Sequence, residues 1–189
     1  MSGLTQSERA HAHYEEAMRS EDGGQRIVLL KRAVSLDPEF AEAYIELGKS
    51  YLDLDEVEEA ERALRAAIGL DDNGWAHLYL GHLYYCEEDW DAALKEFHAA
   101  KGRLPESSAP LWCIADIHRS AGELEESERY CRAAVAVEPS AAALARLGRL
   151  LIEKGERAEG AIYVRRALEV DGRCRVALKC ARRYKLRRS

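Results

Sequence analysis

The sequence has few residues that interrupt helices, and it has no segment suited to crossing a membrane. Only 4 of its 189 residues are proline, whereas 47% are hydrophobic and 33% are charged. This composition favours a globular, helical protein over a disordered or fibrous one. The first residues contain no apolar leader, and no later segment supplies the roughly 18 uncharged apolar residues that a membrane span requires. A soluble, cytoplasmic protein is therefore expected.

Cysteine and histidine are present, but their spacing argues against metal binding. The five Cys are odd in number and include no CxxC pair, which disfavours both a disulfide framework and a structural zinc site. The cysteines are expected to be small buried hydrophobes. His77 and His82 are about 140° apart around a helix. His82 and Cys86 share a helix face, but zinc needs three or four ligands. No metal or other cofactor is predicted.

Catalytic motifs are also missing. The sequence contains no GxSxG, no HExxH and no glycine-rich phosphate loop after a strand. Isolated carboxylates such as Asp89 and Asp91 suit the start of a helix better than acid–base catalysis. The sequence therefore predicts a protein that is not an enzyme.

An internal repeat organises nearly the whole chain. Five alanines recur at intervals of 34, 33, 34 and 33 residues, namely Ala33, Ala67, Ala100, Ala134 and Ala167. Four pairs recur in phase with them, namely Leu47-Gly48, Leu80-Gly81, Ile114-Ala115 and Leu147-Gly148. The apolar residues of each unit follow helical spacing, and Pro or Gly between units ends the second helix. Each unit is thus predicted to be two helices.

The repeat gives a complete assignment of elements and requires no strand. Helix pairs are predicted at about 7–36, 41–70, 74–103, 108–137 and 141–170, with a last helix at about 174–187. We expect one domain over 1–189, with repeats at about 7–40, 41–73, 74–107, 108–140 and 141–174.

The unit resembles the tetratricopeptide repeat, with its pattern W-x2-L-G-x2-Y…A-x3-F…A…P. The third unit matches it well, with His77, Leu80-Gly81, Tyr84, Ala93, Phe97, Ala100 and Pro105. The first unit departs from it, because His13-Tyr14 replaces Leu-Gly and Arg26 replaces a small residue. The resemblance implies an all-α, right-handed superhelical solenoid of five helix-turn-helix repeats plus a C-terminal capping helix. The small residues would let paired helices approach closely.

In similar proteins the first helix of each pair lines a concave groove. Carried onto this sequence, the candidate groove residues are Glu42, Glu46, Lys49, Trp75, Tyr79, His82, Tyr85, Trp112, Asp116, Arg119, Arg146, Arg149, Lys179 and Arg183. The expected groove is acidic, then aromatic, then basic. Trp75, Tyr79, Tyr85 and Trp112 are the expected anchors, since exposed aromatic residues often dominate binding. Alternatively, Trp75 and Trp112 cover neighbouring side chains.

The same helix faces carry charged residues that are expected to contact a partner. Arg119, Arg146 and Arg149 are expected to contact acidic groups of a partner, because guanidinium groups match carboxylates in geometry. His77 belongs to the packing face of its helix, whereas Cys86 shares the groove-facing stripe with Trp75.

The resemblance predicts a non-catalytic interaction module or scaffold for a peptide or protein of unknown identity. Some members of the family bind the C-terminal carboxylate of chaperones with a clamp of Lys, Asn, Asn, Lys and Arg. This clamp is absent here. The aligned positions hold His11, Glu15, Glu46, Trp75 and Tyr79. An alternative is a chaperone-like or inhibitory partner of one specific secreted protein or toxin.

Charge is distributed unevenly along the chain. Residues 1–100 hold 9 Lys+Arg and 22 Asp+Glu, whereas 101–189 hold 19 and 12. The tail from Arg173 to Ser189 contains eight basic residues and no acidic one. It could bind nucleic acid, an anionic membrane surface or an acidic protein. Alternatively, Val176, Leu178 and Ala181 cover the last repeat and the basic residues keep the outer face hydrated.

Overall fold

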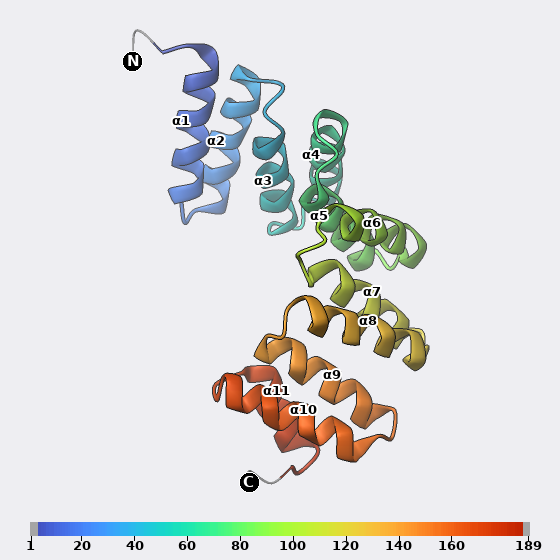
Figure 1. The fold of residues 1–189 in the computed structure, drawn as a ribbon. Helices are drawn as coiled ribbons and strands as arrows, with labels where there is room; N and C mark the ends of the chain where they lie inside the picture. The colour runs from blue at the N-terminus through green and yellow to red at the C-terminus, as the bar shows by residue number, and fades with distance from the viewer. Residues whose placement is uncertain (1–3, 187–189) are drawn as a thin grey trace. The chain divides into compact units, whose positions relative to one another are not determined.

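The computed structural model describes residues 4–186, which fold into eleven helices and contain no strand. Ten of the helices form five successive pairs, and the eleventh follows them (Figure 1). The bounds are α1 Gln6–Arg19, α2 Gly23–Leu36, α3 Ala41–Leu52, α4 Val57–Leu70, α5 Gly74–Cys86, α6 Trp90–Arg103, α7 Ala109–Ser120, α8 Leu124–Val137, α9 Ala141–Glu153, α10 Arg157–Val170 and α11 Arg175–Arg183. The all-α repeat architecture predicted from the sequence is confirmed.

The chain forms two compact units, each with its own hydrophobic core. Unit 1 ends at Arg103 and contains α1 to α6, and unit 2 begins at Leu104 and contains α7 to α11. Alanine and leucine dominate both cores. The five recurrent alanines are all fully buried, which explains why their spacing marks the repeat. None of the helices within residues 4–186 is long and apolar enough to cross a membrane.

Glycine allows the two helices of a repeat to approach closely. A Cβ atom added at Gly48 would lie 2.6 Å from the Leu64 side chain. In unit 2, a Cβ at Gly148 would lie 2.7 Å from the backbone oxygen of Gly160, and a Cβ at Gly160 would lie 2.5 Å from the oxygen of Gly148. Such distances are shorter than atomic contacts allow, so α9 and α10 meet through their backbones. The role expected for these small residues is therefore confirmed.

The turn inside each of four repeats uses the same left-handed backbone position. Asp55 and Glu88 adopt φ angles of 62° and 61°, and Gly122 and Gly155 adopt 81° and 100°. Left-handed backbone is easy for glycine and unfavourable for other residues. These four positions recur at the period of the repeat, so the turn geometry is conserved within the chain even where glycine is absent.

The final helix, α11, is shorter than the sequence predicts. The prediction runs to about 187, which lies outside the described residues, whereas α11 ends at Arg183. It ends because Lys185 takes a left-handed φ of 52° and the Leu186 N–H bonds back to the carbonyl of Ala181 at 2.9 Å. Ala177 and Cys180 are buried against α9 and α10, whereas the expected Val176, Leu178 and Ala181 are half-buried. α11 therefore covers the last repeat.

The cysteines are all free thiols, and they differ in exposure. Cys131, Cys174 and Cys180 are buried and Cys113 is half-buried, as small hydrophobes should be. Cys86 is exposed, because it ends α5 at the turn before α6, so the expectation of burial is wrong there.

Candidate functional site

A pocket of about 270 Å³ opens in unit 1 on a face built by the first helices of three repeats. It draws residues from α1, α3 and α5 and from the cap of α5. The lining residues are Tyr14, Glu42, Ile45, Glu46, Asn73, Trp75 and Tyr79. Four of them, Glu42, Glu46, Trp75 and Tyr79, are residues that the sequence predicts for a binding surface.

The aromatic wall of the pocket is set by the start of α5. The side-chain oxygen of Asn73 accepts a hydrogen bond from the Trp75 N–H at 2.9 Å, which caps the helix. Trp75 therefore projects from the first turn, and its side chain is left 44% exposed. Tyr79 follows one turn later, with its ring centroid 6.5 Å from that of Trp75 and the ring planes tilted by 32°. Together the two rings present a broad aromatic surface.

The part of the pocket that α3 contributes is acidic. Glu42 and Glu46 lie one turn apart on α3, so their carboxylates share a face. Glu46 accepts a hydrogen bond from the Lys49 ammonium at 3.2 Å. Glu42 is exposed and makes no hydrogen bond or ion pair with the residues that the structure describes. The pocket thus contains two carboxylates, of which one already has a cationic partner.

Tyr14 brings α1 to the same pocket. Its ring packs against Phe40, with the centroids 5.0 Å apart. Burial raises the pKa of the Tyr14 hydroxyl, and the nearby carboxylates of Glu46 and Glu42 raise it further. These two carboxylates oppose the formation of a third negative group, so the field in the pocket favours cations.

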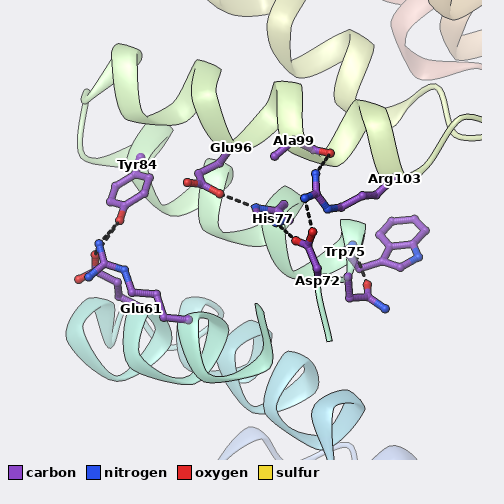
Figure 2. A network of polar contacts seen from close by, with 10 residues as sticks. Glu61, Asp72, Trp75, His77, Tyr84, Glu96, Ala99 and Arg103 are labelled. Carbon is purple, nitrogen blue, oxygen red and sulfur yellow. Dashed lines mark hydrogen bonds and ion pairs between the residues drawn. The ribbon is translucent and has the colours of Figure 1, made fainter. Parts of the chain in front are cut away.

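A polar network behind the pocket holds the start of α5 in place (Figure 2). The His77 Nδ1 lies 2.6 Å from a carboxylate oxygen of Glu96, and its Nε2 lies 2.8 Å from one of Asp72. Arg103 bonds both Asp72 and the carbonyl of Ala99. These hydrogen bonds, first from Arg103 and then from His77, lower the pKa of Asp72. The α4–α5 turn is thereby tied to α6.

His77 and Trp75 consequently lie on different faces of α5. His77 is buried with both ring nitrogens in contact with carboxylates, in agreement with the packing role predicted for it. The Trp75 side chain points away from that network in Figure 2. Within residues 4–186, no three His, Cys, Asp or Glu side chains are arranged to hold a metal ion.

Three further candidates of unit 1 lie outside the pocket lining. Lys49 lies beside it, with its ammonium 5.9 Å from the centre of the Tyr79 ring. His82 is exposed, and its ring packs edge-on to Phe97 at 5.3 Å. Tyr85 packs edge-on to Trp90 at 5.0 Å. His82 and Tyr85 thus contact aromatic residues of α6.

Trp112 in unit 2 is not the exposed anchor that the sequence suggests. Its side chain is only 8% exposed, and it packs in a core cluster with Leu111 and Cys131. The Arg146 guanidinium covers the ring at 5.3 Å. The reason lies in the repeat: the residue two before the recurrent Leu or Ile is also buried in the other three units that carry this pair, at Ile45, Leu78 and Ala145. The alternative, that Trp112 covers neighbouring side chains, describes it better.

Three of the six charged candidates of unit 2 pair with one another, namely Asp116, Arg119 and Arg149. Arg119 Nε donates to Asp116 at 3.5 Å, and Arg149 approaches the same carboxylate at 3.8 Å. Arg149 also lies 3.8 Å from Glu153. Two of the three arginines expected to contact partner carboxylates, Arg119 and Arg149, therefore already face carboxylates of their own unit. Lys179 and Arg183 lie on the exposed surface of α11, and Arg187 and Arg188 of the basic tail lie outside the described residues.

The candidates predicted from the sequence lack three residues of the pocket, namely Tyr14, Ile45 and Asn73. Tyr14 occupies the repeat position of Gly48 and Gly81. A large aromatic residue there cannot make the close helix–helix approach that glycine allows, which indicates that its side chain packs elsewhere. Asn73 could have been found from the sequence, because Asn immediately before a helical segment is a common N-cap residue.

Comparisons with known proteins agree with this architecture. Models of the tetratricopeptide repeat match residues 6–79, 78–139 and 114–175. The human protein O-mannosyl-transferase TMTC3 is 27% identical over 157 residues, which are 79% of this chain but 17% of that protein. The chain thus spans about a sixth of the length of that relative.

Two solved structures illustrate the similarity of fold. Pseudomonas aeruginosa PilF has a TM-score of 0.81 at 17% identity, with 95% of this chain and 86% of that chain covered. YrrB, described as a TPR protein with an unusual peptide-binding site, has a TM-score of 0.67 at 19% identity, with 92% of each chain covered. At such identities the likeness concerns the fold alone. Because the family models cover residues 6–175, this chain belongs to the tetratricopeptide repeat family.

Proposed function

We propose that this chain is a non-catalytic scaffold that binds a peptide or an extended protein segment on the first-helix face of unit 1. Tetratricopeptide repeat proteins are generally non-catalytic interaction scaffolds, and their partners are proteins or peptides. The observation that carries the proposal is the pocket of Trp75, Tyr79, Glu42 and Glu46, to which three successive repeats contribute.

The exposure of Trp75 is the strongest single argument for binding. Trp75 is 44% exposed at a pocket, and Trp and Tyr are enriched among the residues that dominate interfaces. Trp75 is rigidly placed, since the Asn73 cap and the His77 network fix the start of α5. A preformed aromatic surface reduces the entropy lost on binding.

A pull-down from the source cell tests this proposal. Trp75→Ala should abolish or strongly reduce the capture of a specific protein, because interface tryptophans often contribute about 2 kcal/mol or more. Trp90→Ala is a matched control, since Trp90 is 39% exposed but lies on α6 outside the pocket. Equal capture by the two variants would refute the proposal.

The same experiment addresses the alternative functions. A chain truncated before Arg173 lacks the basic tail and α11. If truncation alone removed all capture, the pocket would not be the binding site. A single protein recovered in equal amount with this chain would favour a dedicated chaperone or inhibitor over a general scaffold.

A further inference from the structure

We infer that the pocket of unit 1 accepts one arginine side chain of the bound segment, between the aromatic wall of Trp75 and Tyr79 and the carboxylates of Glu42 and Glu46. This inference rests on the proposed function, because it names the chemistry that the site selects. A guanidinium group can stack on an aromatic ring and donate to carboxylates at the same time.

The size of the pocket fits one long side chain. Pockets for drug-sized ligands and cofactors usually measure about 300–1,000 Å³, and this one measures about 270 Å³. Aromatic rings and two carboxylates line it, so an apolar side chain would leave the Glu42 carboxylate without a partner. A partner carboxylate would be repelled by Glu42 and Glu46.

The protein already contains an internal example of the arrangement. The Lys49 ammonium lies 5.9 Å from the centre of the Tyr79 ring and 3.2 Å from a Glu46 oxygen. This cation therefore contacts the same two kinds of group that the pocket offers. Trp75 and Glu42 line the same pocket, and Glu42 has no ion pair among the described residues.

The charge balance favours a further cation rather than a neutral ligand. Two carboxylates line the pocket and one ammonium lies beside it, so the local charge is net negative. Glu42 and Glu46 are one turn apart on α3, which lets both approach a single flat group with several N–H donors. Arginine meets this requirement better than lysine, whose ammonium acts as a point charge.

A titration with defined peptides tests the inference. The probes are acetyl-Gly-Arg-Gly-amide and its citrulline analogue, which has nearly the same shape but no charge. Binding is followed by NMR through the indole N–H signal of Trp75, assigned with Trp75→Phe. The arginine peptide should shift this signal saturably at millimolar concentration, as expected for so small a ligand, and the citrulline peptide should bind at least about tenfold more weakly.

Variants of the acidic wall complete the test. Glu42→Gln should weaken binding of the arginine peptide about fivefold or more, whereas Glu39→Gln, an exposed change outside the pocket, should leave it unchanged. Equal affinity for arginine and citrulline, or no shift at Trp75 up to about 10 mM peptide, would overturn the inference. A tighter fit for trimethyl-lysine than for arginine would also overturn it, because that cation stacks but donates no hydrogen bond.

These outcomes are distinct from failure of the proposed function. If a cellular partner is captured in a Trp75-dependent manner while citrulline replaces arginine without loss, the pocket binds a peptide but does not select arginine. If Trp75→Ala leaves capture unchanged, the proposed function itself is wrong.

Discussion

Lys49 neutralises Glu46 from within the same helix, with the ammonium 3.2 Å from the carboxylate oxygen. The pair is partly exposed, and its lysine lies at the edge of the pocket rather than in its lining. A bound cation would therefore compete with Lys49 for Glu46. The lysine limits the affinity of the site that it borders.

Removing that competition should strengthen binding. Lys49→Gln is expected to raise the affinity for the arginine peptide about two- to fivefold, because a partly exposed ion pair contributes no more than about 1 kcal/mol. The measurement is the NMR titration described above, repeated at low and high salt, where the gain should shrink as salt screens the charges. An unchanged or weakened affinity would show that Glu46 does not contact the ligand.

The contact between Gly148 and Gly160 should make both positions intolerant of a side chain. Gly148→Ala is expected to lower the free energy of unfolding by about 1–3 kcal/mol, since the added Cβ meets backbone atoms that cannot rotate away. Gly69→Ala is the control, because a Cβ there meets nothing within 4 Å. That variant should be more stable than the wild type by up to about 1 kcal/mol. Urea denaturation followed by circular dichroism measures both, and two equal effects would contradict the explanation.

Removing His77 should destabilise unit 1 through the carboxylate that it leaves behind. Glu96 is only 13% exposed, so His77→Ala is expected to cost about 1–3 kcal/mol. The double variant His77→Ala/Glu96→Ala should cost less than the sum of the two single changes, because the contact can be lost only once. Strictly additive losses of unfolding free energy would indicate that the 2.6 Å contact contributes nothing.

Protonation of Glu128 at low pH should lower the stability of unit 2. Hydrogen bonds from Lys154 and then from Arg132 hold the pKa of Glu128 below its usual range. A carboxyl whose pKa is lower in the folded state stabilises the protein above its unfolded pKa of about 4.3 and loses that effect as pH falls through the folded value. Glu128→Gln should therefore melt below the wild type at pH 7, and the difference should shrink towards pH 3. A difference independent of pH would refute this.

The cysteines should react in the order of their exposure. Burial raises the pKa of both Cys113 and Cys131 to about 12, so their reactive thiolate forms are scarce near neutral pH. Cys86 is exposed and should be alkylated first by iodoacetamide at pH 8. Mass spectrometry of the digested protein gives the order, and modification of Cys131 at the rate of Cys86 would show that unit 2 opens readily.

The repeat made the fold readable from sequence, whereas the exposure of single aromatic residues was harder to predict. The recurrent alanines and Leu-Gly pairs mark the close packing of helices that is repeated along the chain. Two such features seldom recur together at one period by chance. Trp75 and Trp112 look alike in the sequence, but they occupy different repeat positions. The position of Trp112 is buried in each of the last four repeats, and comparing it with Ile45 and Leu78 would have revealed this. The pairing of Asp116 with Arg149 joins two different repeats and depends on side-chain geometry, which the spacing of residues in the sequence cannot predict.

The backbone contact between α9 and α10 also limits how unit 2 can move. With Gly148 and Gly160 in direct contact, no side chain separates the two helices at that point, and none can rotate to let them slide or separate. The two helices are therefore expected to move together as one rigid body. Any adjustment of unit 2 to a bound partner is expected to arise elsewhere than between α9 and α10 at this contact.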